Sequence, residues 1–321
     1  MTAKKTSAPW LETAIAAALL YGVATHADAQ SGVGSGVNLP NRSVYALTSD
    51  QSIYVLAPGT KQYMRLGRAE TAQDGGHLVG IDFRPADANP NRMYGVTDKG
   101  SIYTIDLPGL RTTLVSRMNP HYTGGYNVLV DFNPVANSLR VTGGNDQNLA
   151  VVNGTDGGNL NTTAVQTTLA YVKGDVNFGQ DPEIIGGAYN NNFAGAATTL
   201  FYMIDHDKDT LVTIADRTAT GSSNTGGGKL QTVGGIVDQF GVSFNMSPTA
   251  DFDIYTDANG TNYLVGQSTR WLFSIDLSQI DPNSPVGRRQ QVTAFRGSAA
   301  PVPGATAPLT GGVFDIAIPT R

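Results

Sequence analysis

The stretch Gly80-Ile-Asp-Phe-Arg-Pro85 recurs as Leu129-Val-Asp-Phe-Asn-Pro134. Related cores appear as Asp251-Phe-Asp-Ile-Tyr255 and Val313-Phe-Asp-Ile-Ala317, and Ile185-Gly-Gly-Ala-Tyr189 fills the same slot without the acid. Each core alternates between side chains for the two faces of a strand, and it is rich in the β-branched or aromatic residues that strands prefer. A strand core that returns along the chain predicts a repeat architecture.

Three further strands follow most of these cores, separated by short turns rich in Gly, Asn and Asp. One first strand is roughly 50 to 60 residues from the next. We expect the fourth strands at Thr113–Arg117, Val165–Val172, Lys229–Val233 and Gln291–Phe295. No stretch after the N-terminal segment keeps an apolar 3.6-residue period over several turns, so the sequence predicts an all-β protein.

Four-stranded sheets repeated around an axis make a β-propeller. The N-terminal part supplies three strands, near Val44, Ile53 and Tyr63, and the C-terminal part supplies one, Gly312–Ile318. Pairing the C-terminal strand with the N-terminal blade would close the ring and remove exposed edges. We therefore expect one domain over residues 43–321, with about five four-stranded blades. A sixth blade beginning at Gly241–Met246 and a long two-sheet sandwich are the alternatives.

Composition excludes several classes of protein. The chain has 321 residues, 15% charged residues, a net charge of -5 and no cysteine. The absence of cysteine rules out disulfide scaffolds, thiolate metal sites and cysteine nucleophiles. The acidic balance argues against a nucleic-acid partner, which would need a basic surface.

The N-terminus has the parts of a bacterial export signal. Lys4 and Lys5 precede an apolar run over residues 14–24, and Ala27-Asp-Ala29 supplies small residues before a cleavage point. We expect residues 1–29 to be a signal peptide, residues 30–42 a flexible linker, and the mature chain to be secreted, periplasmic or at the cell surface. No later segment is apolar for long enough to cross a membrane.

Acids occupy one position in four of the five repeated cores: Asp82, Asp131, Asp253 and Asp315. Carboxylates that converge on a propeller axis would repel one another unless a hard cation such as calcium or a proton neutralised them. Alternatively, each Asp accepts hydrogen bonds from backbone amides of its own blade. Strand alternation favours this structural role, because it places the acid between blades rather than in the channel.

Three histidines remain after His26: His77, His121 and His206. Up-and-down strand order places their loops on one face of the ring. Carboxylates in loops of the same face are Asp74, Asp98, Asp146, Asp181, Glu183, Asp207, Asp209 and Asp238. Imidazoles and carboxylates together could bind a divalent metal or perform acid-base chemistry, although loops are commonly polar without such a role.

Two weaker patterns are present. Asp205-His-Asp-Lys-Asp209 alternates acids like a calcium loop, but it lacks the Gly and distal Glu of an EF-hand and is typical of a hairpin tip. Asn190–Asn192 with Phe193, and Tyr122 with Tyr126, could form a sugar-binding lip. The same residue types are common in β-turns.

Several stretches resemble a family of exported bacterial proteins, domain of unknown function 4394. They are Val79–Pro85, Leu129–Val141, Asn145–Leu149, Ala188–Asn190 and Thr198–Asp205. The resemblance covers roughly Ser43 to Pro319 and implies a propeller-like exported module. It implies no activity and no catalytic residues.

Three functions remain open from the sequence. The first is an extracytoplasmic binding or scaffold module for a small molecule, glycan or protein; it is favoured because no nucleophile-base arrangement or complete metal motif is readable. The second is a metal-assisted hydrolase or lyase at the channel mouth. The third is a self-assembling surface or matrix protein. Propellers host both binding and catalysis, so fold alone does not decide between them.

Overall fold

The computed structural model describes residues 36–320, except positions 61, 72–74, 108, 125–127, 154–159, 215–226, 269–270, 282–289, 299 and 302–312. Its regular elements are β-strands and one short 3-10 turn, η3 (Leu277–Gln279). The all-β prediction is confirmed. Within the described ranges, no helix has the length and apolar character needed to cross a membrane.

The strands form antiparallel groups of four, which we call blades and describe from the innermost strand outward. Blade 1 contains β22 (Val313–Ala317), β1 (Val44–Thr48), β2 (Ser52–Leu56) and β3 (Gln62–Arg68). Blade 2 contains β4 (Leu78–Phe83), β5 (Arg92–Thr97), β6 (Ser101–Asp106) and β7 (Arg111–Arg117). Blade 3 contains β8 (Leu129–Asn133), β9 (Ser138–Thr142), β10 (Asn148–Asn153) and β11 (Leu160–Val165). Blade 4 contains β13 (Ile184–Tyr189), β14 (Phe201–Asp205), β15 (Thr210–Ile214) and β16 (Lys229–Asp238). Blade 5 contains β17 (Asp251–Thr256), β18 (Asn262–Ser268), β19 (Trp271–Asp276) and β20 (Gln290–Ser298).

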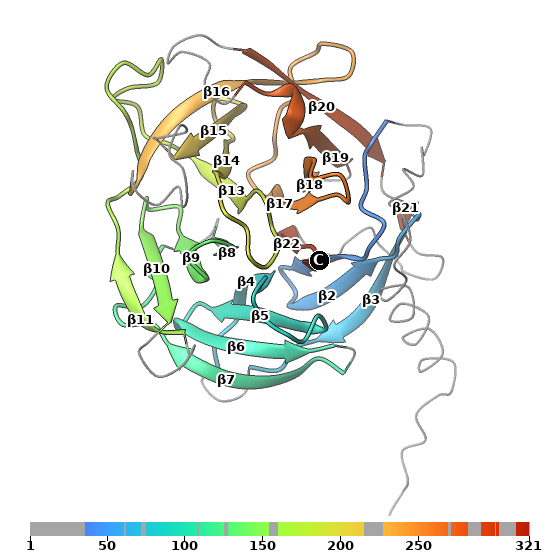
Figure 1. Ribbon diagram of the computed structural model, residues 1–321, viewed down its shortest axis with the longest axis vertical. Helices are drawn as coiled ribbons and strands as arrows, with labels where there is room; N and C mark the ends of the chain where they lie inside the picture. The colour runs from blue at the N-terminus through green and yellow to red at the C-terminus, as the bar shows by residue number, and fades with distance from the viewer. Residues whose placement is uncertain are drawn as a thin grey trace, which may run out of the picture.

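The blades are arranged radially around a central axis (Figure 1), and we call the region along this axis the channel. Their innermost strands contact one another in the order β22, β4, β8, β13 and β17, and β17 contacts β22 again. β22, near the C-terminus, pairs antiparallel with β1, with Tyr45 opposite Ala317. Phe314 and Tyr45 therefore belong to one sheet, and the arrangement is a ring rather than a two-sheet sandwich.

Hydrophobic side chains fill the spaces between neighbouring blades. Five buried clusters lie between blades 1 and 2, 2 and 3, 3 and 4, 4 and 5, and 5 and 1. Ile81 and Phe83 on β4 face blade 1, for example, while Val130 and Phe132 on β8 face blade 2. Because side chains alternate along a strand, the residues between them turn toward the following blade. The repeated Asp occupies such a position.

Outer edges of several blades are covered by other strands. β16 and β20 pair in parallel and join blades 4 and 5 into one sheet. A Cβ on Gly234 would lie 1.9 Å from the Gln290 carbonyl oxygen, so this close approach requires glycine. The short strands β12 (Ala170–Tyr171) and β21 (Ala300–Pro301) pair in parallel with β16 and β3. Such pairing reduces the number of exposed edges.

The fourth strand of blade 3 was predicted wrongly. It is β11, which ends at Val165, and the following residues Ala170 and Tyr171 instead pair with blade 4. Leu169 and Tyr171 are buried in the hydrophobic cluster between blades 3 and 4. Their burial between the blades explains why this segment has the apolar pattern of a strand.

Two other segments differ from the sequence expectations. Gly241–Met246 forms no strand, and its described pairing is a single bridge between Val237 and Ser243. Of the segment expected to be a flexible linker, residues 36–42 lie within the described chain and pack on the ring. Val37 is buried, and the main-chain N–H of Asn38 donates to Ser274 Oγ at 2.8 Å. The expected signal peptide, residues 1–29, lies outside the described residues.

Candidate functional site

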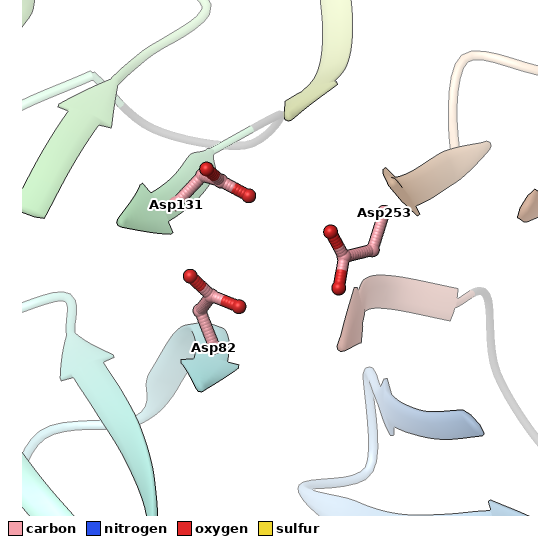
Figure 2. Close-up of side chains that lie close together, drawn as sticks. All are labelled: Asp82, Asp131 and Asp253. Atoms are coloured by element: carbon pink, nitrogen blue, oxygen red, sulfur yellow. The ribbon is translucent and has the colours of Figure 1, made fainter. Parts of the chain in front are cut away.

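The inner-strand acids are buried at the channel. Asp82, Asp131, Asp253 and Asp315 come from β4, β8, β17 and β22, and each is at most 2% exposed. Figure 2 shows Asp82, Asp131 and Asp253 directed toward a common space from three blades. Ala188 takes the corresponding place on β13 and is also buried. Three of the four acids that share this position in the repeated cores therefore lie close to one another.

Each of these four acids connects its blade to the next one. Asp82 Oδ2 accepts from the N–H of Phe132 at 2.7 Å, and Asp131 Oδ1 accepts from that of Tyr189 at 3.1 Å. Asp253 Oδ2 accepts from Ile318 at 2.6 Å, and Asp315 Oδ2 accepts from Ile81 at 2.5 Å. Three of the acids also accept from the residue that follows them, at 2.5 to 2.9 Å. The sequence predicted hydrogen bonds from each Asp to its own blade, and the structure adds hydrogen bonds that link neighbouring blades.

A fifth buried acid, Asp251, was missed. It is 2% exposed and begins β17, two residues before Asp253, so alternation places both on one side of the strand. Its Oδ2 accepts from the N–H of Ile316 at 3.2 Å, and its carboxyl group hydrogen-bonds that of Asp315. A hydrogen bond between two carboxyl groups needs a proton, so this pair carries at most one negative charge. The sequence signal that could have revealed Asp251 is its position two residues before Asp253, since residues two apart on a strand lie on the same side.

Burial and mutual repulsion disfavour ionisation in this cluster. Burial raises the pKa of Asp253 to about 8 and that of Asp251 to about 7. Burial also raises the pKa of Asp82, Asp131 and Asp315 well above its ordinary value, and neighbouring carboxylates add to the effect. Among the described residues, no Lys or Arg forms an ion pair with any of the five acids. Protons or a cation must therefore offset most of their charge.

Three of the acids have the spacing of a cation site. One carboxylate oxygen from each of Asp82, Asp131 and Asp253 lies within 4.8 Å of the other two. Ligands at about 2.4 Å from a calcium ion are separated by at most about 4.8 Å, so the donor set fits a hard cation. Asp315, the fourth acid predicted for this site, is not in the group and pairs with Asp251 instead. Most oxygens of the three acids already accept backbone hydrogen bonds.

A pocket opens at the end of the channel where the innermost strands begin, which we call the mouth. It has a volume of about 730 Å³. The beginnings of all five innermost strands contribute to its wall: Leu78 and Val79, Val128, Ile185, Ala250, and Val313 and Phe314. Pro248 and Thr249 extend this largely apolar wall on blade 5.

The polar part of the mouth belongs to blades 1 and 2: Ser49, Asp50, Gln51, Arg68, His77 and Asp98. Arg68 Nη2 lies 3.6 Å from Asp50 Oδ2. The amide of Gln51 pairs with the backbone of Leu78, donating at 3.0 Å and accepting at 2.6 Å. The pocket therefore has apolar lining from all five blades and a group of polar side chains from blades 1 and 2. Asp50 and Arg68 were not predicted from the sequence, because they occupy a β-turn and a strand end without a recognisable motif.

The predicted histidines lie in separate blade connections. His77 is exposed and lines the mouth, and its main-chain N–H donates to Asp98 Oδ1 at 3.0 Å. The carbonyl of His121 accepts from Gln147 Nε2 at 3.4 Å. His206 Nδ1 lies 3.7 Å from Asp207 Oδ1. In the described part of the chain, none of the three belongs to a group of potential metal ligands.

The other predicted ligand-face acids have varied surroundings. Asp238 is buried; it accepts from the N–H groups of Phe240 and Val242 at 3.0 Å and pairs with Arg296 Nη2 at 2.7 Å, which fixes a turn. The side chain of Asp207 is 63% exposed. Asp181 is exposed and its carbonyl accepts from Lys208 Nζ at 2.8 Å. Asp74 lies outside the described residues.

The residues suggested for a sugar-binding lip do not share one end of the channel. Asn191 and Asn192 follow β13 and bond Asn262 and Thr256 of blade 5, beyond the ends of the innermost strands. Tyr122 precedes β8 on the mouth side and is 3% exposed. Tyr126 lies outside the described residues.

Comparisons with known proteins give one family match. The profile described as Domain of unknown function (DUF4394) matches residues 70–295. None of the curated proteins matches the chain.

Three solved structures show low similarity to this chain. An auxiliary nutrient binding protein from Bacteroides thetaiotaomicron has 13% identity and a TM-score of 0.38, over 68% of this chain and 55% of its own. The chain thus spans about half the length of that protein. The major Malassezia sympodialis allergen Mala s 1 has 14% identity and a TM-score of 0.41, over 80% of this chain and 78% of its own. A structural genomics protein of unknown function from Bacteroides thetaiotaomicron has 11% identity and a TM-score of 0.43, over 93% of this chain and 68% of its own.

The family match is the more informative comparison, since it covers more than half of the 321 residues. It also agrees with the resemblance carried by the repeated strand cores. The protein belongs to the family Domain of unknown function (DUF4394).

Proposed function

We propose that this protein is an extracytoplasmic binding module that holds a small ligand at the mouth of its channel. One observation carries the proposal: the beginnings of all five innermost strands, together with turns from blades 1 and 2, line a single pocket of about 730 Å³. Pockets for small ligands commonly have volumes of roughly 300–1,000 Å³ and combine an apolar wall with a few polar groups. The mouth has both features.

The rigidity of the surrounding elements supports binding. Ile185, Val128 and Val313 are buried in the wall. The side chain of Gln51 forms two hydrogen bonds with the backbone of Leu78, the first residue of β4. A site held by strands loses little conformational entropy when a ligand binds.

The enzyme alternative has less support from the geometry. A metal-assisted reaction needs a metal with an open position facing a substrate. Among the described residues, the only group with metal-site spacing is the buried Asp82, Asp131 and Asp253. The pocket contains one histidine, His77.

Blocking the mouth tests the proposal. N-phenyl-1-naphthylamine, a neutral fluorescent probe of apolar pockets, should bind the wild-type chain saturably and with one site. Thr249→Trp places a large ring at an exposed lining position and should weaken binding at least tenfold. Asn245→Trp, on the same connection but outside the pocket lining, is the matched control and should bind as the wild type does. Equal losses in both variants, or no saturable binding by the wild type, would contradict the proposal.

Export is the second part of the proposal. It is supported by the charged, apolar and small-residue segments over residues 1–29. N-terminal sequencing of protein recovered from a bacterial expression culture should show a chain that starts at Gln30. Recovery from the cytoplasm with residues 1–29 retained would argue against export.

A further inference from the structure

The charges around the mouth indicate the kind of ligand that would bind there. The lining contains two carboxylates, Asp50 and Asp98, and one guanidinium, that of Arg68. Arg68 lies against Asp50, at 3.6 Å, so these two charges largely offset each other. Asp98 remains as a carboxylate without an ion-pair partner among the described residues.

The hydrogen bonding of Asp98 leaves part of its carboxylate available. Its Oδ1 accepts from the main-chain N–H of His77 at 3.0 Å, which holds the side chain beside the pocket. The residue is exposed on the β5–β6 turn. A ligand cation near this carboxylate would form a charge-assisted hydrogen bond or an ion pair.

Among the described residues that line the pocket, the charge that has no opposite partner is therefore the negative charge of Asp98. Apolar walls of low dielectric strengthen the field of such a charge.

The apolar part of the lining fits the rest of such a ligand. Val128, Ile185 and Ala250 offer aliphatic surface, and Phe314 is a half-buried aromatic ring at the start of β22. An aromatic face attracts cations and also packs against apolar groups. Anionic ligands gain little here, because Arg68 is already beside Asp50.

We propose that the ligand of the mouth is a small organic cation: an ammonium group attached to an apolar aliphatic or aromatic body. This inference rests on the proposed binding function. The ammonium group would lie on the side of Asp98, and the apolar body would lie against the beginnings of β8, β13, β17 and β22.

Matched amphiphiles test the charge preference. Octyltrimethylammonium, octanoate and octanol share one chain length and differ in the charge of the head group. Each is titrated against the full chain carrying N-phenyl-1-naphthylamine, and displacement is followed by fluorescence. The cation should displace the probe at a concentration at least tenfold lower than octanoate, with octanol between them. Raising the salt from about 0.05 to about 0.5 M should narrow this difference.

A variant at Asp98 tests whether this residue causes the preference for a cationic ligand. Asp98→Asn preserves an oxygen that can accept from His77 N–H, so the turn should stay folded, and it should reduce the affinity for the cation about fivefold more than that for octanol. Asp207→Asn, an exposed acid outside the lining, is the control and should change neither affinity. Equal displacement by the cation and octanoate, or tighter binding of octanoate, would overturn the inference while leaving the pocket in place. Failure of the neutral probe to bind the wild type would instead remove the binding function itself.

Discussion

The mouth and the acid cluster beneath it are built from the same five strands, yet they differ in openness and in polarity. The mouth is a cavity whose wall is mainly apolar, with polar groups on one side. The acid cluster contains five carboxyl groups, and each of the five residues is at most 2% exposed. Hydrogen bonds to backbone N–H groups of neighbouring blades occupy these carboxyl groups. The comparison indicates that the open end is suited to a ligand, whereas the buried end holds the ring together.

Overfilling the acid cluster should have the largest effect. A Cβ on Gly80 would lie 2.2 Å from Val130 Cγ2 and 2.7 Å from Asp315 Oδ2. We expect Gly80→Val to lower the free energy of unfolding by about 3 kcal/mol, because a packed interior cannot accommodate the added volume. Urea unfolding followed by tryptophan fluorescence measures this.

The matched change at the mouth is Val79→Thr, one residue earlier on the same strand, at a half-buried lining position. It should cost about 1 kcal/mol or less, since the site is partly open. Similar losses for the two variants would mean that the mouth and the acid cluster are equally constrained.

Neutralising one acid should stabilise the ring at high pH. Asp131 Oδ1 accepts from Tyr189 N–H, and one carboxylate oxygen of Asp131 lies within 4.8 Å of oxygens of Asp82 and Asp253. Asn at position 131 can keep the first bond and donate from Nδ2 to Asp82 or Asp253. We expect Asp131→Asn to raise the free energy of unfolding by about 1–2 kcal/mol at pH 8 and to change it little at pH 5.

The sign follows from the raised pKa values. The unfolded chain loses these protons near pH 4, whereas the folded chain keeps them until higher pH, near 8 for Asp253. The folded state therefore binds more protons between these limits, and wild-type stability falls as the pH rises through this window. Asp82→Asn is the contrasting variant: both oxygens of Asp82 accept backbone N–H groups, so an amide NH₂ there should destabilise. Stabilisation by both variants, or by neither, would contradict the assigned hydrogen bonds.

The smallest effect should come from an acid of the mouth. Burial opposes ionisation of Asp50, but hydrogen bonds from Thr48 and Ser52 and the charge of Arg68 outweigh it and lower its pKa. A lowered pKa gives stability that is present above about pH 4 and lost as the pH falls through the folded value. Asp50→Asn should therefore cost at most about 1 kcal/mol at pH 7 and nothing at pH 2, as thermal unfolding at the two pH values would show. A larger loss at pH 2 than at pH 7 would contradict this reasoning.

The sequence predicted the parts of this molecule that repeat. The shared Asp-Phe and Asp-Ile cores located the innermost strands and four of the five buried acids, since both depend on local alternation. The fourth strand of blade 3 was misplaced because Leu169 and Tyr171 are buried by contacts with another blade. Asp50 and Arg68 meet only after β1, β2 and β3 have paired, so no local pattern could reveal them.

The acids illustrate the same limit. Their common position was readable, but the partner of each lies in the next blade, at least 50 residues away in the sequence. Whether they serve a cation or the backbone depends on these nonlocal N–H groups. The volume of the mouth likewise depends on how five strands meet.

A crystal structure of the full chain, grown with both calcium and octyltrimethylammonium, compares the two regions in one measurement. We expect density for the ammonium compound at the mouth, with its head group beside Asp98, and no ion among Asp82, Asp131 and Asp253. An ion held by these three carboxylates at about 2.3–2.6 Å, with nothing bound at the mouth, would contradict it.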